Sequence, residues 1–287
     1  MVKEFQETLY DAVAQTYRID KMYFEQKTDH QHLMIFHNAF LGRVMTLDGI
    51  VQTTEKDEFI YHEMMAHVPL FNHAGAEQVL IIGGGDGGML REALKHANVK
   101  KVVMVEIDAA VIDMAKQYLP NHSAGAFDDD RAEIIIADGM DFVRNTEMRF
   151  DVIISDSTDP IGPGEVLFSN DFYAQCKRIL NSDGIMVAQN GVPFFQIDEV
   201  LNTQSRMSAH FSEQTFFSAA VPTYYGGIMT FAYASNNSEL SNVDRATLHS
   251  RFKSAAIKTR YYTPNIHLAS FALPKYIEDA LAAQSSE

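Results

Sequence analysis

The stretch VLIIGGGDGG occupies residues 79–88 and joins four apolar residues to a glycine-rich turn. A short apolar run that ends in glycine is typical of a strand buried on both faces of a sheet. Gly83, Gly85 and Gly88 then match the spacing G-x-G-x-x-G, directly before a helix that we expect over residues 88–97. At such a turn, backbone N–H groups and a helix N-terminus can approach a nucleotide closely. The stretch therefore predicts a nucleotide-binding unit, which both NAD enzymes and S-adenosylmethionine enzymes contain.

Toward the C-terminus, apolar runs alternate with helical segments. We expect further strands over 101–107, 133–137, 151–155 and 185–189, and helices over 109–118, 139–146 and 170–180. Continuous apolar runs separated by helices predict an α/β fold with a parallel sheet. Two later β-prone runs, 215–221 and 228–234, predict an antiparallel hairpin at the edge of that sheet.

Toward the N-terminus, the periodicity changes between residues 55 and 75. Before this change we expect short strands over 17–24, 32–37, 43–47 and 51–54. The pair Asp48-Gly49 favours a tight hairpin turn between the last two. These patterns predict a small antiparallel β domain at residues 1–56, followed by an α/β domain at residues 57–287.

The composition limits the classes of partner. With 38 acidic and 23 basic residues, the net charge is −15, which disfavours nucleic acid and favours a cationic ligand. Cys176 is the only cysteine, and residues 1–13 lack a cationic-then-apolar signal segment, so we expect a cytoplasmic protein. The apolar runs are shorter than the roughly 20 residues of a membrane helix, so we expect no membrane span.

Acidic residues stand at the ends of the predicted strands, where ligands bind in open parallel sheets. Glu106 lies 18 positions after Gly88, where a carboxylate can accept both ribose hydroxyls and disfavours the phosphate of NADP. Asp138-Gly139 ends the next strand, where the carboxylate suits an adenine amine. Asp86, inside the glycine loop, would repel a pyrophosphate and attract a sulfonium nucleoside that carries an ammonium group. Solvated or helix-capping acids are the alternative interpretation of these positions.

The segment DVIISDSTDPIGPGEVLF, residues 151–168, places Asp156 and Asp159 just past a buried strand. Two prolines and two glycines at 160–164 predict an irregular loop that could cover a pocket. Too few metal-ligating partners stand nearby, so the pair favours amine recognition over metal binding. An aliphatic amine of pKa about 10.4 is only about a thousandth neutral at pH 7, so a base must remove its proton before it attacks carbon. Turn formation before Pro160 is the alternative.

These residues resemble the spermidine synthases (polyamine aminopropyltransferases), especially their bacterial members. The resemblance covers nearly the whole chain and is carried by TDHQHLMIF (28–36), DEFIYHE (57–63), GGGDGG (83–88), DSTDPIGP (156–163), PTYYGG (222–227) and RYYTP (260–264). It implies a small N-terminal β domain, a Rossmann-like domain of the methyltransferase type, and a homodimer or homotetramer. The implied reaction moves the aminopropyl group of decarboxylated S-adenosylmethionine to putrescine, giving spermidine and methylthioadenosine without a metal or other cofactor.

The resemblance also implies roles for individual residues. Asp156 would accept the amine proton during direct displacement at the carbon next to the sulfonium. Contacts to the nucleoside donor are implied for Gln31, Asp86, Glu106, Asp138, Gly139 and Pro163. Contacts to the diamine are implied for Tyr61, His62, Asp159, Gln189 and Tyr224. For the aromatic residues of this set, ordinary core packing is the interpretation that the sequence pattern alone favours.

Three other functions use similar features. A putrescine N-methyltransferase would use intact S-adenosylmethionine, although Asp86 and the complete DSTD segment argue against it. A polyamine or nucleoside sensor would bind ligand without needing a base at Asp156. A nicotinamide dehydrogenase shares only the glycine loop. The preferred length of the diamine depends on the depth of the pocket, which the sequence leaves open.

Overall fold

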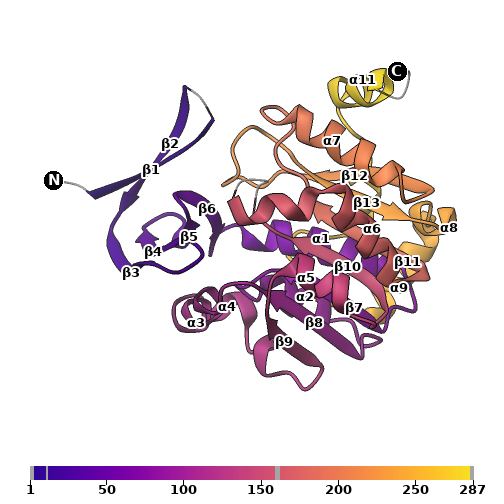
Figure 1. Ribbon diagram of the computed structural model, residues 1–287, viewed down its shortest axis with the longest axis horizontal. Coiled ribbons are helices and arrows are strands. Elements are labelled where there is room, and N and C mark those ends of the chain that lie inside the picture. The colour runs from indigo at the N-terminus through magenta and orange to yellow at the C-terminus, as the bar shows by residue number, and fades with distance from the viewer. Residues whose placement is uncertain (1–2, 11, 159–161, 285–287) are drawn as a thin grey trace.

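Three β-sheets are present in residues 3–10, 12–158 and 162–284, which the computed structural model describes (Figure 1). The largest has seven strands in the order β12-β13-β11-β10-β7-β8-β9. Its strands are β7 (Gln78–Gly83), β8 (Lys101–Glu106), β9 (Ala132–Ile136), β10 (Phe150–Asp156), β11 (Leu180–Gln189), β12 (Glu213–Ala219) and β13 (Met229–Ser235). The five strands from β11 to β9 are parallel, whereas β13 is antiparallel to β11 and to β12. The predicted parallel sheet with an antiparallel hairpin at its edge is confirmed.

Helices cover both faces of this sheet. They are α1 (Glu58–Asn72), α2 (Gly88–Leu94), α3 (Ala109–Tyr118), α4 (Pro120–Ser123), α5 (Gly139–Asn145), α6 (Asn170–Ile179), α7 (Ile197–Ser208), α8 (Ser238–Ser241), α9 (Arg245–Ala255), α10 (Pro264–Ser270) and α11 (Lys275–Gln284). Val79 and Ile81 pack into the cluster that contains α1 and α2, whereas Leu80 and Ile82 pack into the cluster of α5, α6 and α7. Alternate residues of one apolar strand are thus buried on opposite faces, as its composition predicts. No helix in the described ranges is long and apolar enough to span a bilayer.

Two small antiparallel sheets precede the seven-stranded one and lie to one side of it in Figure 1. One pairs β1 (Lys3–Tyr10) with β2 (Val13–Ile19), and the other contains β3 (Lys21–Lys27), β4 (His32–Asn38), β5 (Gly42–Leu47) and β6 (Ile50–Thr54). The predicted hairpin turn between β5 and β6 is confirmed, since Asp48 and Gly49 have φ of 49° and 81°.

The N-terminal strands differ from the predicted ones in two ways. β1 was not expected, and the strand expected over 17–24 is divided at Asp20 between β2 and β3. The Asp20 carboxylate accepts the Ala39 N–H at 2.6 Å and the Arg18 Nε–H at 2.7 Å. These bonds anchor the point at which the chain leaves one sheet and enters the next.

The glycine loop fits tightly against β10. Gly83 pairs with Asp156 across the sheet and has a φ of +83°. A Cβ atom at Gly83 would lie 2.0 Å from the Asp156 carbonyl oxygen, so only glycine fits there. The strand order reverses between β7 and β10, because β8 and β9 lie on one side and β11 lies on the other. The loop and the end of β10 therefore meet at the switch point of the sheet, where ligands bind in open α/β folds.

Candidate active site

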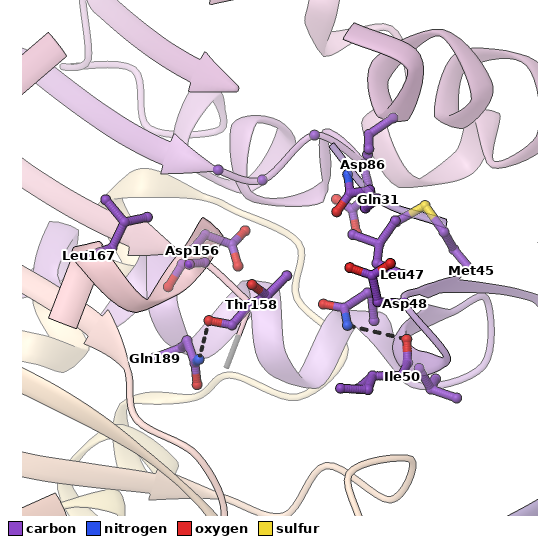
Figure 2. Close-up of a pocket in the computed structure, with 18 of the residues that line it drawn as sticks. Gln31, Met45, Leu47, Asp48, Ile50, Asp86, Asp156, Thr158, Leu167 and Gln189 are labelled. Atoms are coloured by element: carbon purple, nitrogen blue, oxygen red, sulfur yellow. Dashed lines mark hydrogen bonds between the residues drawn. The ribbon is translucent and has the colours of Figure 1, made fainter. Parts of the chain in front are cut away.

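A cavity of about 220 Å³ opens over the carboxyl ends of β7, β8, β10 and β11. The N-terminal segments supply its opposite wall through Met45 and Leu47 of β5 and through Gln31, which directly precedes β4 (Figure 2). Nine predicted site residues within the described ranges line it: Gln31, Tyr61, Asp86, Glu106, Asp138, Gly139, Asp156, Gln189 and Tyr224. The structure therefore brings residues from both halves of the chain to one site.

Glu106 and Asp138 line one side of this cavity. Glu106 ends β8, and its Oε1 accepts the Asp108 N–H at 3.0 Å. Burial raises the pKa of Glu106 to about 7, although this hydrogen bond opposes the shift. Asp138 precedes α5 and accepts the Asp141 N–H at 2.9 Å, so it caps that helix while it lines the cavity. Both carboxylates are placed to accept hydrogen bonds from neutral donors.

Gln31 joins the N-terminal strands to this side of the cavity. Its Nε2 donates to the Asp108 Oδ2 at 3.1 Å, and the Thr28 hydroxyl donates to the same oxygen at 2.7 Å. The other Asp108 oxygen accepts the Ala110 N–H at the start of α3. One carboxylate thus fixes the segment that carries Gln31 against the sheet edge.

Asp86 belongs to a chain of buried charges. Its Oδ1 accepts the Gly88 N–H at 2.7 Å, and its Oδ2 lies 3.4 Å from the His62 Nε2. The His62 Nδ1 lies 2.7 Å from Glu58, which also binds Arg91 at 2.8 Å. Asp86 therefore accepts the first N–H of α2, whose N-cap residue is Gly87, and its carboxylate also lines the cavity.

His62 is the centre of this charge chain. Burial alone would lower the pKa of His62, but Asp86 and Glu58 outweigh it and raise that pKa to about 10. The same pairing outweighs the effect of burial on Asp86 and holds its pKa well below the usual range. Among the described residues that line the cavity, Asp86 is present and His62 is not. His62 therefore stands behind Asp86 as a buried imidazolium.

The charge on His62 predicts that the stability of the protein depends on pH. Its pKa is raised from 6.5 to about 10, so its contribution to the free energy of unfolding is complete below pH 6.5 and is lost as the pH rises through 10. We expect His62→Gln to be less stable than the wild type near neutrality, with a difference that shrinks toward pH 10. Urea unfolding across this range measures it. The control is His30→Gln, at an exposed position; a His62→Gln difference that does not change with pH would contradict the prediction.

Asp156 ends β10 and faces Asp86 across the cavity (Figure 2). The Tyr61 hydroxyl donates to its Oδ1 at 2.6 Å. Burial, followed by the nearby Asp86, raises the pKa of Asp156 to about 6, while His62 and the Tyr61 bond oppose the rise. Burial and Asp156 in turn raise the pKa of Tyr61 well above 10, so Tyr61 remains a donor. Asp156 is therefore a carboxylate near neutral pH that can take up a proton.

Aromatic and amide groups form the wall next to Asp156. The rings of Tyr61 and Tyr224 meet edge to face at 6.0 Å, and the Tyr224 hydroxyl donates to the Gln52 carbonyl. The Gln189 Nε2 donates to the Thr158 carbonyl at 3.2 Å, a bond drawn in Figure 2. The Gln189 Oε1 accepts the Gly191 N–H at 3.0 Å. These contacts fix the side chains that define the space beside Asp156.

The side chains of two predicted site residues are not described by the structure. Asp159 lies outside the described residues, and Pro163 falls within a short helical segment, η2 (Gly162–Phe168), in which its side chain is not described. In the ranges that the structure describes, no group of three or more His, Cys, Asp or Glu side chains is arranged to hold a metal.

Sequence reasoning missed several polar residues that line the cavity. They are Glu7, Tyr10, Asp48, Gln52, Thr158 and Tyr225. The segment KEFQETLY contained a signal for the first of these, because Phe5 and Glu7 are two positions apart and both are buried on one side of β1. An acidic residue at an inward-facing position of a strand is a candidate site residue.

Two family models match the chain. The spermine/spermidine synthase domain matches residues 58–245, and the spermidine synthase tetramerisation domain matches residues 3–55. Polyamine aminopropyltransferase 1 of Pseudomonas aeruginosa is 57% identical over 286 residues, which cover 100% of each chain. The polyamine aminopropyltransferase of Erwinia tasmaniensis is 59% identical over 276 residues, which cover 96% of this chain and 97% of that protein.

Solved structures agree with these matches. A spermidine synthase in complex with the transition-state analogue AdoDATO has a TM-score of 0.93 and 40% identity, covering 98% of this chain and 95% of the other. The spermidine synthase of Thermotoga maritima has a TM-score of 0.90 and 38% identity, covering 98% and 94%. The sheet order, the acidic cavity and these matches over nearly the whole chain lead to one conclusion: the chain belongs to the spermidine synthase family.

Proposed function

We propose that the protein is a spermidine synthase, which transfers the aminopropyl group of decarboxylated S-adenosylmethionine to putrescine and releases methylthioadenosine. One observation carries the proposal: Asp86 and Asp156 face one cavity that Glu106 and Asp138 also line. Two carboxylates beside a nucleoside site suit a substrate that carries an ammonium group and a second substrate that is itself an amine. The relatives named above support the same reaction.

In the donor half of the cavity, Glu106 accepts the two ribose hydroxyls and Asp138 accepts the adenine amine. Gly139 borders the base, and glycine suits this position because a Cβ there would lie 2.6 Å from the side chain of Ile82, which also lines the cavity. Gln31 and Pro163 complete the nucleoside contacts. Asp86 holds the ammonium of the aminopropyl group, and His62 keeps Asp86 ionised.

In the amine half, Tyr61, Tyr224 and Gln189 surround the diamine, and Asp159 holds its distal ammonium. The attacking amine loses its proton to Asp156, since burial beside the sulfonium favours the neutral amine. Its lone pair forms the new C–N bond while the C–S bond breaks. The bonding electrons pass to sulfur, which leaves as a neutral thioether and needs no acid. Positioning of the two substrates in line supplies most of the rate, without a cofactor.

We further propose that residues 1–56 and 57–287 form two domains of a cytoplasmic homodimer or homotetramer that binds neither nucleic acid nor membranes. The match of residues 3–55 to a tetramerisation domain supports the assembly. The net charge of −15 supports the exclusion of nucleic acid. Light scattering of the purified protein measures the oligomeric state.

Incubation with putrescine and each of two donors tests the function. With decarboxylated S-adenosylmethionine, mass spectrometry should detect spermidine and methylthioadenosine. A product that gains one methyl group from intact S-adenosylmethionine would instead identify an N-methyltransferase. Binding of both ligands without any product would identify a sensor.

Proton release on nucleoside binding is a further prediction. Glu106 has a pKa of about 7, and ribose hydroxyls that donate to its carboxylate would stabilise the charged form. Methylthioadenosine should therefore bind more tightly as the pH rises through 7, with release of a proton. Calorimetry in buffers of different ionisation enthalpy measures that proton. Glu106→Gln should abolish the pH dependence of methylthioadenosine binding, and Glu133→Gln, at an exposed position, should retain it. Binding by Glu106→Gln that still tightens as the pH rises through 7 would contradict the assignment.

A further inference from the structure

Asp57 stands at the N-cap position of α1, yet its side chain does not cap that helix. Its Oδ1 accepts the Thr54 hydroxyl at 2.6 Å. Its Oδ2 accepts both the N–H of Thr223, at 2.8 Å, and the Thr223 hydroxyl. Asp57 and Thr223 are each only 5% exposed, so these bonds are made away from water. The carboxylate that would ordinarily serve α1 instead holds a distant loop.

The two segments that Asp57 joins carry the rings of the amine half. Tyr61 lies four positions after Asp57 on α1 and donates to Asp156. Tyr224 follows Thr223 directly and meets Tyr61 edge to face at 6.0 Å. Two contacts from N-terminal strands hold the same loop, since Gln15 donates to the Thr223 carbonyl at 3.2 Å and Tyr224 donates to the Gln52 carbonyl.

We propose that Asp57 is a positioning residue that sets the spacing between Tyr61 and Tyr224, and with it the acceptance of the diamine. The inference rests on the proposed function. Asp57 acts through the two rings and touches neither substrate. Because the Thr223 N–H is buried, loss of its acceptor leaves that donor unsatisfied and lets the loop shift.

The donor half has separate supports. Glu106 is held by the Asp108 N–H, and Asp138 by the start of α5. Neither carboxylate is bonded to Asp57 or Thr223 in the described structure. A disturbance at Asp57 is therefore expected to change the use of the amine and to leave nucleoside binding in place.

Asp57→Asn tests this expectation, because the amide keeps the shape but offers only one acceptor oxygen for three donors. We expect kcat/KM for putrescine to fall about tenfold to a hundredfold, as for loss of a hydrogen bond to a charged group. The preference for putrescine over cadaverine should also fall. The Kd of methylthioadenosine should change by less than about twofold, which corresponds to less than about half a kcal/mol.

Three further variants separate positioning from general destabilisation. Thr223→Ser keeps both bonds to Asp57 and should retain wild-type diamine preference, whereas Thr223→Val loses the hydroxyl and should lower the preference. Asp244→Asn is the matched control, because Asp244 also accepts the N–H and hydroxyl of a threonine, Thr247, at the start of the exposed α9. Asp244→Asn should leave the diamine preference unchanged, even where it lowers the Tm slightly.

A double-mutant cycle decides the route of the effect. If Asp57 acts through the loop, Tyr224→Phe should lower kcat/KM for putrescine much less in Asp57→Asn than in the wild type. Additive effects of the two substitutions would overturn the inference. So would a loss of methylthioadenosine affinity in Asp57→Asn as large as its loss of kcat/KM for putrescine, or wild-type kinetics of Asp57→Asn. If Asp57→Asn does not fold, identical diamine preferences of Thr223→Ser and Thr223→Val would overturn it. The proposed function fails separately, when the wild type itself transfers no aminopropyl group.

Discussion

Asp156→Asn is expected to lower kcat for aminopropyl transfer by about 10²–10⁴, the range that general bases contribute. The asparagine side chain fills the same volume and can still accept the Tyr61 hydroxyl, which lies 2.6 Å from Oδ1. It cannot take a proton from the amine, so the chemical step loses its base while the cavity keeps its shape. Steady-state assays with decarboxylated donor and putrescine measure kcat, and calorimetry with methylthioadenosine should give the wild-type Kd.

The pH dependence supplies the companion measurement. The pKa of Asp156 is raised to about 6, so its basic form is present above that pH and is lost as the pH falls through it. We expect kcat/KM for putrescine in the wild type to decrease below pH 6, and this decrease to be absent from the residual activity of Asp156→Asn. Near-wild-type turnover by Asp156→Asn would exclude Asp156 as the base.

Asp86→Asn is expected to lower kcat/KM for the decarboxylated donor by roughly 10–100-fold, the effect of losing a hydrogen bond to a charged group. Asp86 is 7% exposed and has a pKa held well below the usual range by His62, so it presents a full negative charge to the cavity. With the proposed assignment, intact S-adenosylmethionine would place a carboxylate here, which Asp86 and Asp156 would repel. The variant should therefore bind the intact donor better relative to the decarboxylated one.

Competition assays with the two donors measure this change in preference. Asp113→Asn is the matched control, because it removes one negative charge from an exposed position on α3. It should leave the ratio of donor affinities unchanged. An unchanged ratio in Asp86→Asn would show that another group rejects the carboxylate.

The strand-end carboxylates could be predicted because their position follows from local pattern. Glu106 and Asp156 each end an apolar run that a helix or loop follows, and parallel strands bring such ends to one edge. The orientation of His62 could not be predicted in the same way. Its spacing of four from Glu58 allowed an ion pair on α1, but its contact with Asp86 depends on how α1 packs against the glycine loop.

The partner of Glu7 on the first strand was also beyond local pattern. Glu7 lies on β1, which mixes charged and apolar residues and was not expected to be a strand. Its carboxylate accepts the Val51 N–H at 2.8 Å, a contact between strands of different sheets. The spacing of Phe5 and Glu7 marks an inward-facing acid, but its partner Val51 becomes visible only once the two sheets are packed.

The loop that carries Tyr224 has a consequence for how the protein folds. Its bonds join Thr223 to Asp57 and Tyr224 to Gln52, pairs that are 166 and 172 positions apart. Contacts of such separation close large loops of chain, whose entropy cost slows their formation. Asp86, Glu106 and Asp138 lie within a much shorter span, between β7 and the start of α5. During folding, and during synthesis on the ribosome, the chain should therefore bring these three carboxylates together first and complete the contacts around Tyr224 last.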